Sequence, residues 1–344
     1  MMKLQADLIY GGLLGLCTAD ALGVPFEGLS RQWMKRHPVT EMEGCRYDGL
    51  PPGSWSDDSS ATFCLADSLA HMTGAFPDKQ DLMERLCRWM QEGDYTPRGA
   101  AFGMGRTTIH SLERYLSGLP LSRCGGKEET DNGNGSLMRI LPLAFYFISG
   151  LGPRLSPLGA PKDNEPAFSL IHEISALTHA HPRSMMACGI YLSVALLLME
   201  ASLEKGAEKS PASLLSTVCQ GISGAQNYYS QAPDFQGELL SFSRIFRPRS
   251  LSSLPQEQIA SGGYVIDTLE SALWCLLNTD SYQTCVLKAI SLGGDTDTTA
   301  AVAGGLCGLW YGPQAIPSRW LEKLARKEWI QELCRRLAIR LGFL

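Results

Sequence analysis

Two short acidic clusters lie far apart in the chain, and each comes directly before an apolar stretch with helical spacing. The first is Ser56-Asp57-Asp58-Ser59, and the second is Gly293-Gly294-Asp295-Thr296-Asp297-Thr298. Neighbouring residues of a regular helix point about 100° apart, so adjacent carboxylates can converge only where a loop turns into a helix. Such a junction collects carboxylate and hydroxyl oxygens. This ligand set favours a hard divalent cation, Mg²⁺ or Mn²⁺, over zinc.

Each cluster could instead only cap its helix. Ser, Thr and Asp are the preferred N-cap residues, and the helix dipole favours acids in the first turn. Capping uses one side-chain oxygen, however, whereas each cluster supplies two carboxylates and two hydroxyls. The two clusters together therefore predict one shared site, in which four carboxylates hold two cations as in two-metal hydrolases.

A third polar segment, Asp131-Asn132-Gly133-Asn134-Gly135, comes directly before another apolar stretch. Asn-Gly pairs tolerate left-handed backbone conformations, so successive amide N–H groups can point into one concavity. Beside a helix N-terminus, this pattern predicts a cradle for a phosphate or diphosphate. Asn-Gly pairs also mark ordinary turns, and that interpretation stays open at this point.

The first apolar stretch of the chain contains an unusual set of glycines, Gly11, Gly12 and Gly15. Glycine lowers helix stability, so we expect another part of the molecule to approach this helix closely. The stretch leads into Asp20-Ala21-x-Gly23-x-Pro25-x-Glu27. Pro25 is expected to fix the turn that directs Glu27.

The elements that must position these motifs are predicted to be helices. No stretch alternates over six or more residues, so strands are expected to be few or absent. The connecting segments are rich in Gly, Pro and Ser, and residues 102–106 are predicted to form a turn. We therefore expect a single, compact all-α domain, an orthogonal helical bundle over residues 1–344. Helical spacing of apolar residues is found in 8–22, 61–72, 82–90, 112–116, 138–148, 171–177, 184–198, 214–222, 265–277, 285–292, 299–310 and 320–341.

Composition excludes several classes of protein. The 344 residues include 30 Lys and Arg against 35 Asp and Glu, a net charge of −5, which argues against a nucleic-acid-binding protein. The 11 cysteines form no C-x-x-C pair, so no zinc knuckle is predicted. Scattered thiols in apolar stretches are typical of a reducing compartment, and we expect a cytoplasmic protein. We also expect a monomer.

Two segments imitate membrane or export signals. Residues 8–19 resemble the apolar region of a signal peptide, but Asp7, Asp20 and the glycines interrupt the pattern. Residues 298–318 are uncharged, but their glycines and prolines favour a core helix followed by a turn. We expect neither segment to enter a membrane.

In combination, the motifs resemble those of the ADP-ribosylglycohydrolase family, which includes dinitrogenase reductase-activating glycohydrolase and the ADP-ribosylarginine hydrolases. The resemblance extends from Gly11 to Gly312, and the first acidic cluster has serine where many members have threonine. It implies an all-helical fold, a centre with two Mg²⁺ or Mn²⁺ ions, and hydrolysis of the bond between ADP-ribose and a protein side chain, with arginine expected. The matching motifs are Asp20-Ala-x-Gly-x-Pro-x-Glu27, Ser56-Asp-Asp-Ser59, Gly133-Asn-Gly-Ser-x-Met-Arg139, Thr178-His179 and Gly293-Gly-Asp-Thr-Asp-Thr298.

The resemblance also implies roles for single residues. Glu27 matches the acid near the scissile bond, and His179 and the segment 131–134 match positions that contact ADP-ribose. A metal-bound carboxylate, Asp57, Asp58, Asp295 or Asp297, would accept a proton from the attacking water, and the choice among the four stays open. The matching metal-ligand positions are Ser56, Asp57, Asp58, Asp295, Asp297 and Thr298. The matching ADP-ribose contacts are Asp131, Asn132, Gly133, Asn134 and His179.

Several alternatives remain at this point. Tyr264 follows two glycines and could face adenine or the diphosphate, or could pack in the core. The enzyme could act on another ADP-ribose conjugate or on a phosphoester. A third possibility is a non-catalytic relative that only binds ADP-ribose; its mark would be lost metal carboxylates, and all four are present. Acceptor choice, arginine or serine, depends on loop shape.

Overall fold

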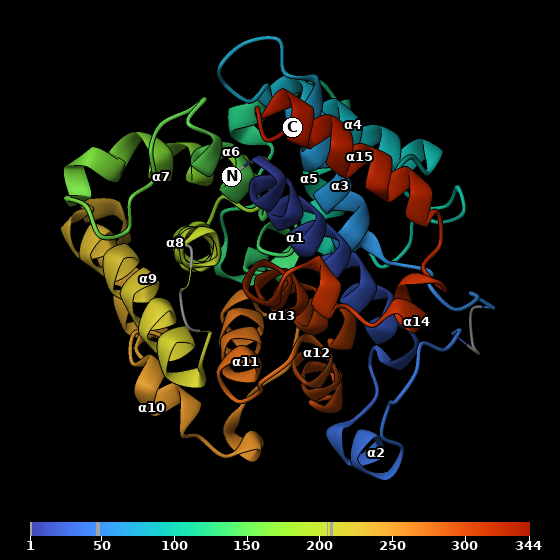
Figure 1. Cartoon of the computed structure of the whole chain (residues 1–344). Coiled ribbons are helices and arrows are strands. Elements are labelled where there is room, and N and C mark those ends of the chain that lie inside the picture. The colour runs from blue at the N-terminus through green and yellow to red at the C-terminus, as the bar shows by residue number, and fades with distance from the viewer. Residues whose placement is uncertain (1, 46–48, 205, 207–208) are drawn as a thin grey trace.

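The chain is described by a computed structural model that covers residues 2–45, 49–204, 206 and 209–344. Helices dominate it (Figure 1), and among the described residues extended backbone pairs only in isolated bridges, which confirms the predicted all-α fold. The helices are α1 (Met2–Gly23), α2 (Arg31–Arg36), α3 (Asp57–His71), α4 (Lys79–Glu92), α5 (Arg106–Leu116), α6 (Pro142–Ser149), α7 (Pro161–Ala176), α8 (Pro182–Leu203), α9 (Pro211–Gln231), α10 (Pro248–Ser252), α11 (Val265–Leu277), α12 (Tyr282–Ser291), α13 (Thr296–Tyr311), α14 (Ser318–Leu321) and α15 (Lys327–Arg340). The 3₁₀ turns used below are η1 (Val24–Phe26), η3 (Glu129–Asp131), η4 (Asn134–Ser136), η5 (Pro233–Phe242) and η6 (Gln256–Gln258).

Helices α1 and α13 run antiparallel and cross the centre of the molecule in direct contact (Figure 1). A Cβ atom on Gly11 would lie 2.4 Å from the carbonyl oxygen of Gly308, and one on Gly15 would lie 2.7 Å from that of Gly304. No larger residue fits at these positions, so the expected close approach to the glycine-rich helix is confirmed. The partner is the second glycine-rich helix of the chain.

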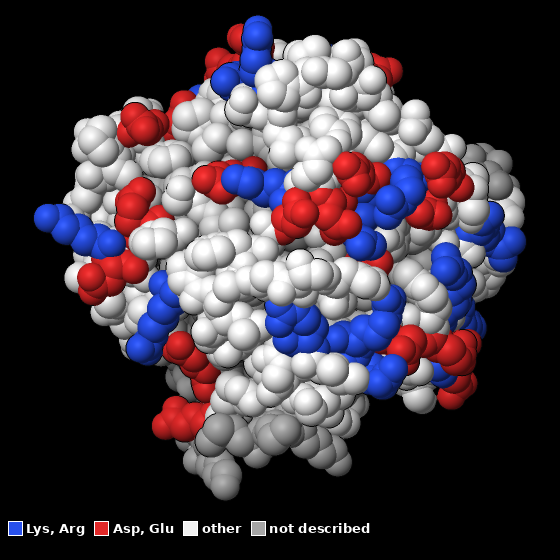
Figure 2. Space-filling model, turned by 90° about the horizontal axis from the view of Figure 1, so that it is seen from above, with Lys and Arg blue, Asp and Glu red and all other residues white. Residues whose placement is uncertain are grey.

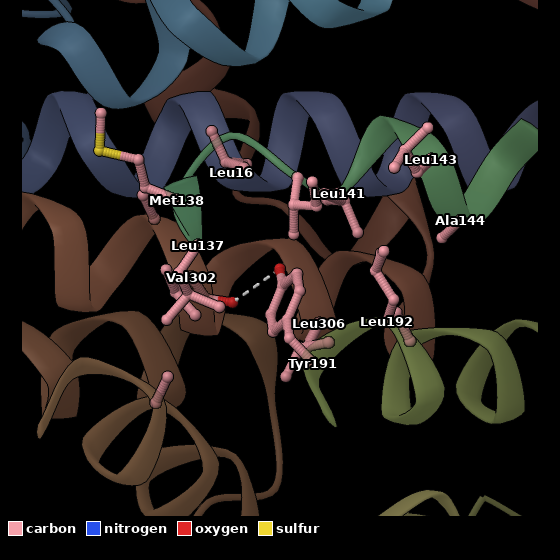
Figure 3. Packing of buried hydrophobic residues seen from close by; sticks show 14 of the residues in the cluster. Leu16, Leu137, Met138, Leu141, Leu143, Ala144, Tyr191, Leu192, Val302 and Leu306 are labelled. Carbon is pink, nitrogen blue, oxygen red and sulfur yellow. Dashed lines mark hydrogen bonds between the residues drawn. The ribbon is translucent and has the colours of Figure 1, made fainter. Parts of the chain in front are cut away.

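Apolar side chains of α6, of α8 and of the segment before α6 pack against this helix pair (Figure 3). Leu16 of α1 and Leu306 of α13 are completely buried, as is Leu141, which comes just before α6. Tyr191 of α8 inserts among them, and its hydroxyl donates a hydrogen bond to the carbonyl oxygen of Val302 at 3.2 Å. The one polar atom of this buried ring is thereby satisfied, as a dry core requires.

The C-terminal region differs from the prediction. The prediction of one continuous helix over 320–341 was wrong, because α14 ends at Leu321 and α15 begins only at Lys327. Between them, the backbone N–H of Ala325 donates to the carbonyl oxygen of Gly53 at 3.1 Å, and Arg326 adopts a left-handed conformation with φ of 47°. This contact with a turn from a distant part of the chain replaces the hydrogen bonds of a continuous helix.

Two helices have the length and composition of membrane spans, Gln5–Phe26 and Pro182–Leu203. In the fold, 89% and 78% of the respective apolar windows are buried, as expected for core helices. The stretch 298–318 forms α13, whose residues are buried up to Trp310, and the turn predicted after it. On the face shown in Figure 2, small groups of basic and acidic side chains are interspersed among uncharged residues.

Candidate active site

The N-termini of α3 and α13, which carry the two acidic clusters, meet at the C-terminal end of α1. A Cβ on Gly23 would lie 2.4 Å from the Cα of Asp297, and the hydroxyl of Thr296 donates to the carbonyl oxygen of Gly23 at 2.9 Å. The antiparallel packing of α1 on α13 therefore places the second acidic cluster beside the C-terminal end of α1. The turn η1, which holds Pro25, then leads to Glu27.

Asp20, in the last turn of α1, binds the first acidic cluster. Its carboxylate accepts hydrogen bonds from the backbone N–H groups of Ser56 and Ser59, both at 3.0 Å, and from both serine hydroxyls. Burial raises the pKa of Asp20 to about 6, and the hydrogen bonds from Ser59 and Ser56 oppose this rise. The sequence interpretation assigned Asp20 no role of its own, although its motif contained the residue.

Three carboxylates from three helices form the core of the acidic site. Asp20, Asp58 and Asp297 each offer an oxygen within 4.8 Å of the other two. Oδ2 of Asp58 lies 2.9 Å from the hydroxyl of Ser56, whose single proton is shared with Asp20, and it accepts a hydrogen bond from the hydroxyl of Thr298 at 3.3 Å. Oxygens from α3 and α13 thus lie around one point. The other oxygen of Asp58, Oδ1, is buried and has no hydrogen-bond partner.

The buried carboxylates of the site repel one another, and a bound cation would relieve this repulsion. Burial raises the pKa values of Asp57, Asp58 and Asp297 well above the ordinary range, and repulsion from neighbouring carboxylates adds to the effect. Buried carboxylates are stable as anions only when paired or bound to a metal. The unpartnered Oδ1 of Asp58, the repulsion and the all-oxygen composition of the cluster thus fit a hard divalent cation.

Helix capping accounts for only part of the two clusters. Ser56 is the N-cap of α3 and accepts a hydrogen bond from the N–H of Asp58 at 3.3 Å. Asp295 occupies the N-cap position of α13, but its side chain makes no capping hydrogen bond. Its Oδ2 instead accepts from the side-chain amide of Asn134 at 2.7 Å. The second cluster is therefore directed toward the third polar segment.

The acids open into a cavity of about 380 Å³, within the size range of small-ligand sites. The predicted site residues that line this cavity are Glu27, Asp57, Gly133, Asn134, His179, Asp295, Asp297 and Thr298. Ser56 and Asp58 are buried and do not line it. Glu27 and Thr298, which are 271 positions apart in the sequence, line the same cavity. The fold therefore brings most of the predicted site residues together.

The wall that faces the third polar segment is tightly packed. His179 is buried, and its Nδ1 lies 2.7 Å from the hydroxyl of Thr178. Burial, with a smaller contribution from the Arg139 guanidinium, lowers the pKa of His179 to about 3, so the ring is neutral near pH 7. A Cβ on Gly135 would lie 2.9 Å from both His179 Cε1 and Thr108 Oγ1, so only glycine fits beside the ring.

Three residues predicted to contact ADP-ribose do not line the cavity: Asp131, Asn132 and Tyr264. The Asp131 carboxylate accepts from the backbone N–H of Glu128 at 3.1 Å, and the Asn132 oxygen accepts from Ser184 at 3.1 Å. The Tyr264 hydroxyl accepts from Arg183 at 3.3 Å. These side chains make hydrogen bonds within the protein, and their contact with ADP-ribose stays a prediction.

Another segment at the cavity was missed. Residues 102–106 were expected to be only a turn, but Gly103, Gly105 and Arg106 line the cavity. A Cβ on Gly103 would lie 2.6 Å from Oδ1 of Asp57, and this glycine has φ of 80°. Two glycines immediately before a helix were the signal in the sequence that pointed to a close approach of this kind.

Comparison with known proteins places these features in one family. The model of the ADP-ribosylglycohydrolase family matches residues 1–342. The chain is 31% identical over 331 residues to the ADP-ribosylarginine hydrolase Tri1 of Serratia proteamaculans, covering 96% of this chain and 79% of that one. It is 29% identical to the ADP-ribosyl-[dinitrogen reductase] glycohydrolase of Rhodospirillum rubrum, covering 93% and 91% of the two chains.

A solved structure gives the same result. It is described as an ADP-ribosylglycohydrolase-related protein complex, and its chain superposes with a TM-score of 0.70 at 30% sequence identity. The alignment covers 98% of this chain and 99% of that one. The helical architecture, the paired acidic clusters and the whole-length matches lead to one conclusion: this chain belongs to the ADP-ribosylglycohydrolase family.

Proposed function

We propose that this chain hydrolyses the glycosidic bond between ADP-ribose and a protein side chain, with arginine as the acceptor and two Mg²⁺ or Mn²⁺ ions bound. One observation supports this function most strongly: carboxylates from α3 and α13 share a cavity with Glu27 and with the loop at Gly133 and Asn134. The names of two relatives, an ADP-ribosylarginine hydrolase and an ADP-ribosyl-[dinitrogen reductase] glycohydrolase, support the reaction and the acceptor.

The residues that would hold the two cations are those of the acidic clusters. When bound, such ions lower the pKa of water and stabilise negative charge. We assign carboxylate ligands to Asp57, Asp58, Asp295 and Asp297, and hydroxyl ligands to Ser56 and Thr298. Asp20 belongs behind them, because its oxygens already accept hydrogen bonds from Ser56 and Ser59.

The remaining chemistry follows from the reaction. A glycosidic bond at the anomeric carbon breaks through a cation-like centre, which nearby carboxylates stabilise. Asp57 and Asp297 both line the cavity, so either can accept the proton of an attacking water. Glu27 also lines the cavity, and we propose that this exposed acid positions the leaving guanidine group of the arginine. Neutral His179 and Asn134 would then bind the ADP-ribose portion.

The test supplies purified protein with Mg²⁺ or Mn²⁺ and with separately prepared arginine-linked and serine-linked ADP-ribose, and measures free ADP-ribose. We expect release from the arginine conjugate, loss of release with EDTA, and no release by Asp297→Ala. Asp234→Asn, which removes an exposed carboxylate on η5, should behave like the wild type. Release from serine alone would overturn the acceptor assignment. Phosphate release without ADP-ribose release would overturn the reaction.

We also propose a cytoplasmic location. All eleven cysteines are free, and ten of them are buried. This pattern is typical of a reducing compartment, where thiols serve as small apolar side chains. Fractionation of the source cells, with antibody detection of the chain, tests it.

A further inference from the structure

Arg31, the first residue of α2, does not line the cavity, yet its guanidinium joins two segments that lead into it. Its Nε donates to the carbonyl oxygen of Leu292 at 2.9 Å. Its Nη1 donates to that of Gln256 at 2.6 Å, and its Nη2 to that of Ile259 at 2.5 Å. The planar guanidinium group thus donates hydrogen bonds to three carbonyl oxygens of two segments that are far apart in the sequence. A lysine ammonium group cannot reproduce this geometry.

The two segments lead directly into the site. Leu292 precedes the bend Gly293-Gly294, after which come Asp295 and helix α13. Ile259 precedes Ser261 and Gly263, and Gly263 lines the cavity close to Asp295: a Cβ on Gly263 would lie 3.3 Å from Asp295 Oδ2. Arg31 therefore fixes the backbone on both sides of one acidic side chain.

The segment that carries Arg31 also carries Glu27. The N–H of Gly28 donates to the carbonyl oxygen of Gly294 at 2.8 Å, and the N–H of Gly294 donates back to that of Leu29 at 2.8 Å. On the opposite side of the bend, the N–H of Asp295 donates to the carbonyl oxygen of Ser261 at 2.8 Å. The bend is thus enclosed between the Glu27 segment and the Ser261 segment, and the Arg31 side chain ties the two together.

The bend has no freedom to shift within this enclosure. Gly293 and Gly294 adopt left-handed conformations with φ of 69° and 74°. A Cβ on Gly293 would lie 2.6 Å from the backbone nitrogen of Arg31, and one on Gly294 would lie 2.2 Å from the carbonyl oxygen of Ser261. Backbone packing this close transmits any displacement of the flanking segments directly to Asp295.

We propose that Arg31 is a positioning residue. Through the three carbonyl oxygens that it binds, it fixes the positions of Asp295 and Glu27 relative to each other at the cavity. Its effect on turnover rests on the proposed function. Its effect on the backbone does not, because the hydrogen bonds of Gly28, Gly294 and Asp295 can be followed directly.

The experiment compares Arg31→Gln and Arg31→Lys with a matched control, Lys35→Gln. Lys35 lies on the same helix, and its exposed ion pair with Glu257 at 3.0 Å joins α2 to η6, next to the segment that Arg31 binds. Exposed ion pairs of this kind contribute little to the stability of a fold. Hydrogen–deuterium exchange measures the amides of Gly28, Gly294 and Asp295. Electron paramagnetic resonance measures Mn²⁺ binding without nucleotide, and steady-state assays measure kcat and KM.

We expect Arg31→Gln to expose these three amides to faster exchange, with little change in core helices such as α8. We expect Mn²⁺ affinity and kcat to fall by about 10- to 100-fold, the usual range for residues that orient metal ligands, with a smaller change in KM. Arg31→Lys should fall between Arg31→Gln and the wild type, and Lys35→Gln should match the wild type.

Three results would overturn the inference: unchanged exchange at these amides in Arg31→Gln, equal effects of Arg31→Gln and Lys35→Gln, or faster exchange throughout the molecule with kcat per folded molecule unchanged. A wild-type protein that releases no ADP-ribose would contradict the proposed function instead. The exchange of the three amides would then still decide the role of Arg31.

Discussion

Gly23 at the end of α1 lies directly against Asp297 in the first turn of α13: a Cβ on Gly23 would lie 2.4 Å from the Cα of Asp297 and 2.7 Å from its backbone nitrogen. The neighbouring atoms are backbone, so they cannot move aside as a flexible side chain would. Gly23 has φ of −79°, so its backbone conformation is open to any residue. The close approach alone therefore requires glycine here.

Gly23→Ala is expected to lower the free energy of unfolding by about 1–3 kcal/mol, the usual effect of overpacking. Alanine gains about 1 kcal/mol in helix propensity, which offsets only part of this loss. Displacement of Asp297 should also reduce kcat/KM at least about 10-fold. Urea unfolding and ADP-ribose release measure the two effects. Gly237→Ala is the control, because a Cβ there would meet no atom within 4 Å. A fully active, wild-type-stable Gly23→Ala would contradict the role of this contact.

Asp20→Asn should weaken the first acidic cluster without removing any proposed ligand. An asparagine offers one acceptor oxygen and places an N–H₂ group among donors from Ser56 and Ser59, so buried donors lose their partner. We expect a loss of about 1–3 kcal/mol in unfolding free energy and of about 10- to 100-fold in Mn²⁺ affinity.

Calorimetric titration with Mn²⁺ and urea unfolding measure the Asp20 effects. Ser59→Ala removes only the hydroxyl donor, so its effect should be smaller than that of Asp20→Asn. A larger effect of Ser59→Ala would assign the positioning to the serine rather than to the carboxylate.

Arg106 is the one lysine or arginine among the described residues that line the cavity. An ADP-ribose ligand carries a negatively charged diphosphate, so we expect Arg106→Gln to raise its dissociation constant about 10-fold, with kcat changed less. Salt should weaken binding by the wild type more than binding by the variant.

Fluorescence competition with ADP-ribose at two salt concentrations measures this effect. Arg123→Gln, an exposed arginine outside the cavity, is the matched control. A fall in kcat with unchanged affinity would show that Arg106 acts on the reaction instead of on the diphosphate.

His172 predicts acid sensitivity that is independent of the active site. Its Nε2 lies 3.0 Å from the hydroxyl of Tyr229, and its ring packs 4.5 Å from that of Phe235. Burial lowers the pKa of His172 from its usual value to about 3. The unfolded chain therefore binds a proton between about pH 6.5 and pH 3 that the folded chain does not, so stability falls as pH falls through this window.

For His172, the loss between pH 7 and pH 5 is about 2 kcal/mol at most. His172→Gln keeps a polar partner for Tyr229 but cannot gain the charge, so its urea midpoint should depend less on pH than that of the wild type. His110→Gln, at an exposed histidine, provides the comparison. An unchanged pH dependence in His172→Gln would contradict the assignment.

Local patterns in the sequence were sufficient for much of the site. Helical spacing predicted an all-α fold, because side-chain periodicity is a property of each segment alone. Surplus oxygens at two loop–helix junctions predicted that Asp57, Asp295 and Asp297 would meet, and all three line one cavity. The glycines of α1 predicted a close helix contact, because a residue without a side chain costs stability unless it is used.

What the sequence determined by itself was the set of chemical groups and the helices that carry them. Their partners were decided only by the tertiary structure. Asp20 supports the first cluster because α1 packs beside α3, and Tyr264 turns to Arg183 instead of the cavity. The break before α15 depends on a contact between Ala325 and Gly53. Each of these outcomes comes from a hydrogen bond between residues distant in the chain, and such pairings leave no periodicity for a local pattern to reveal.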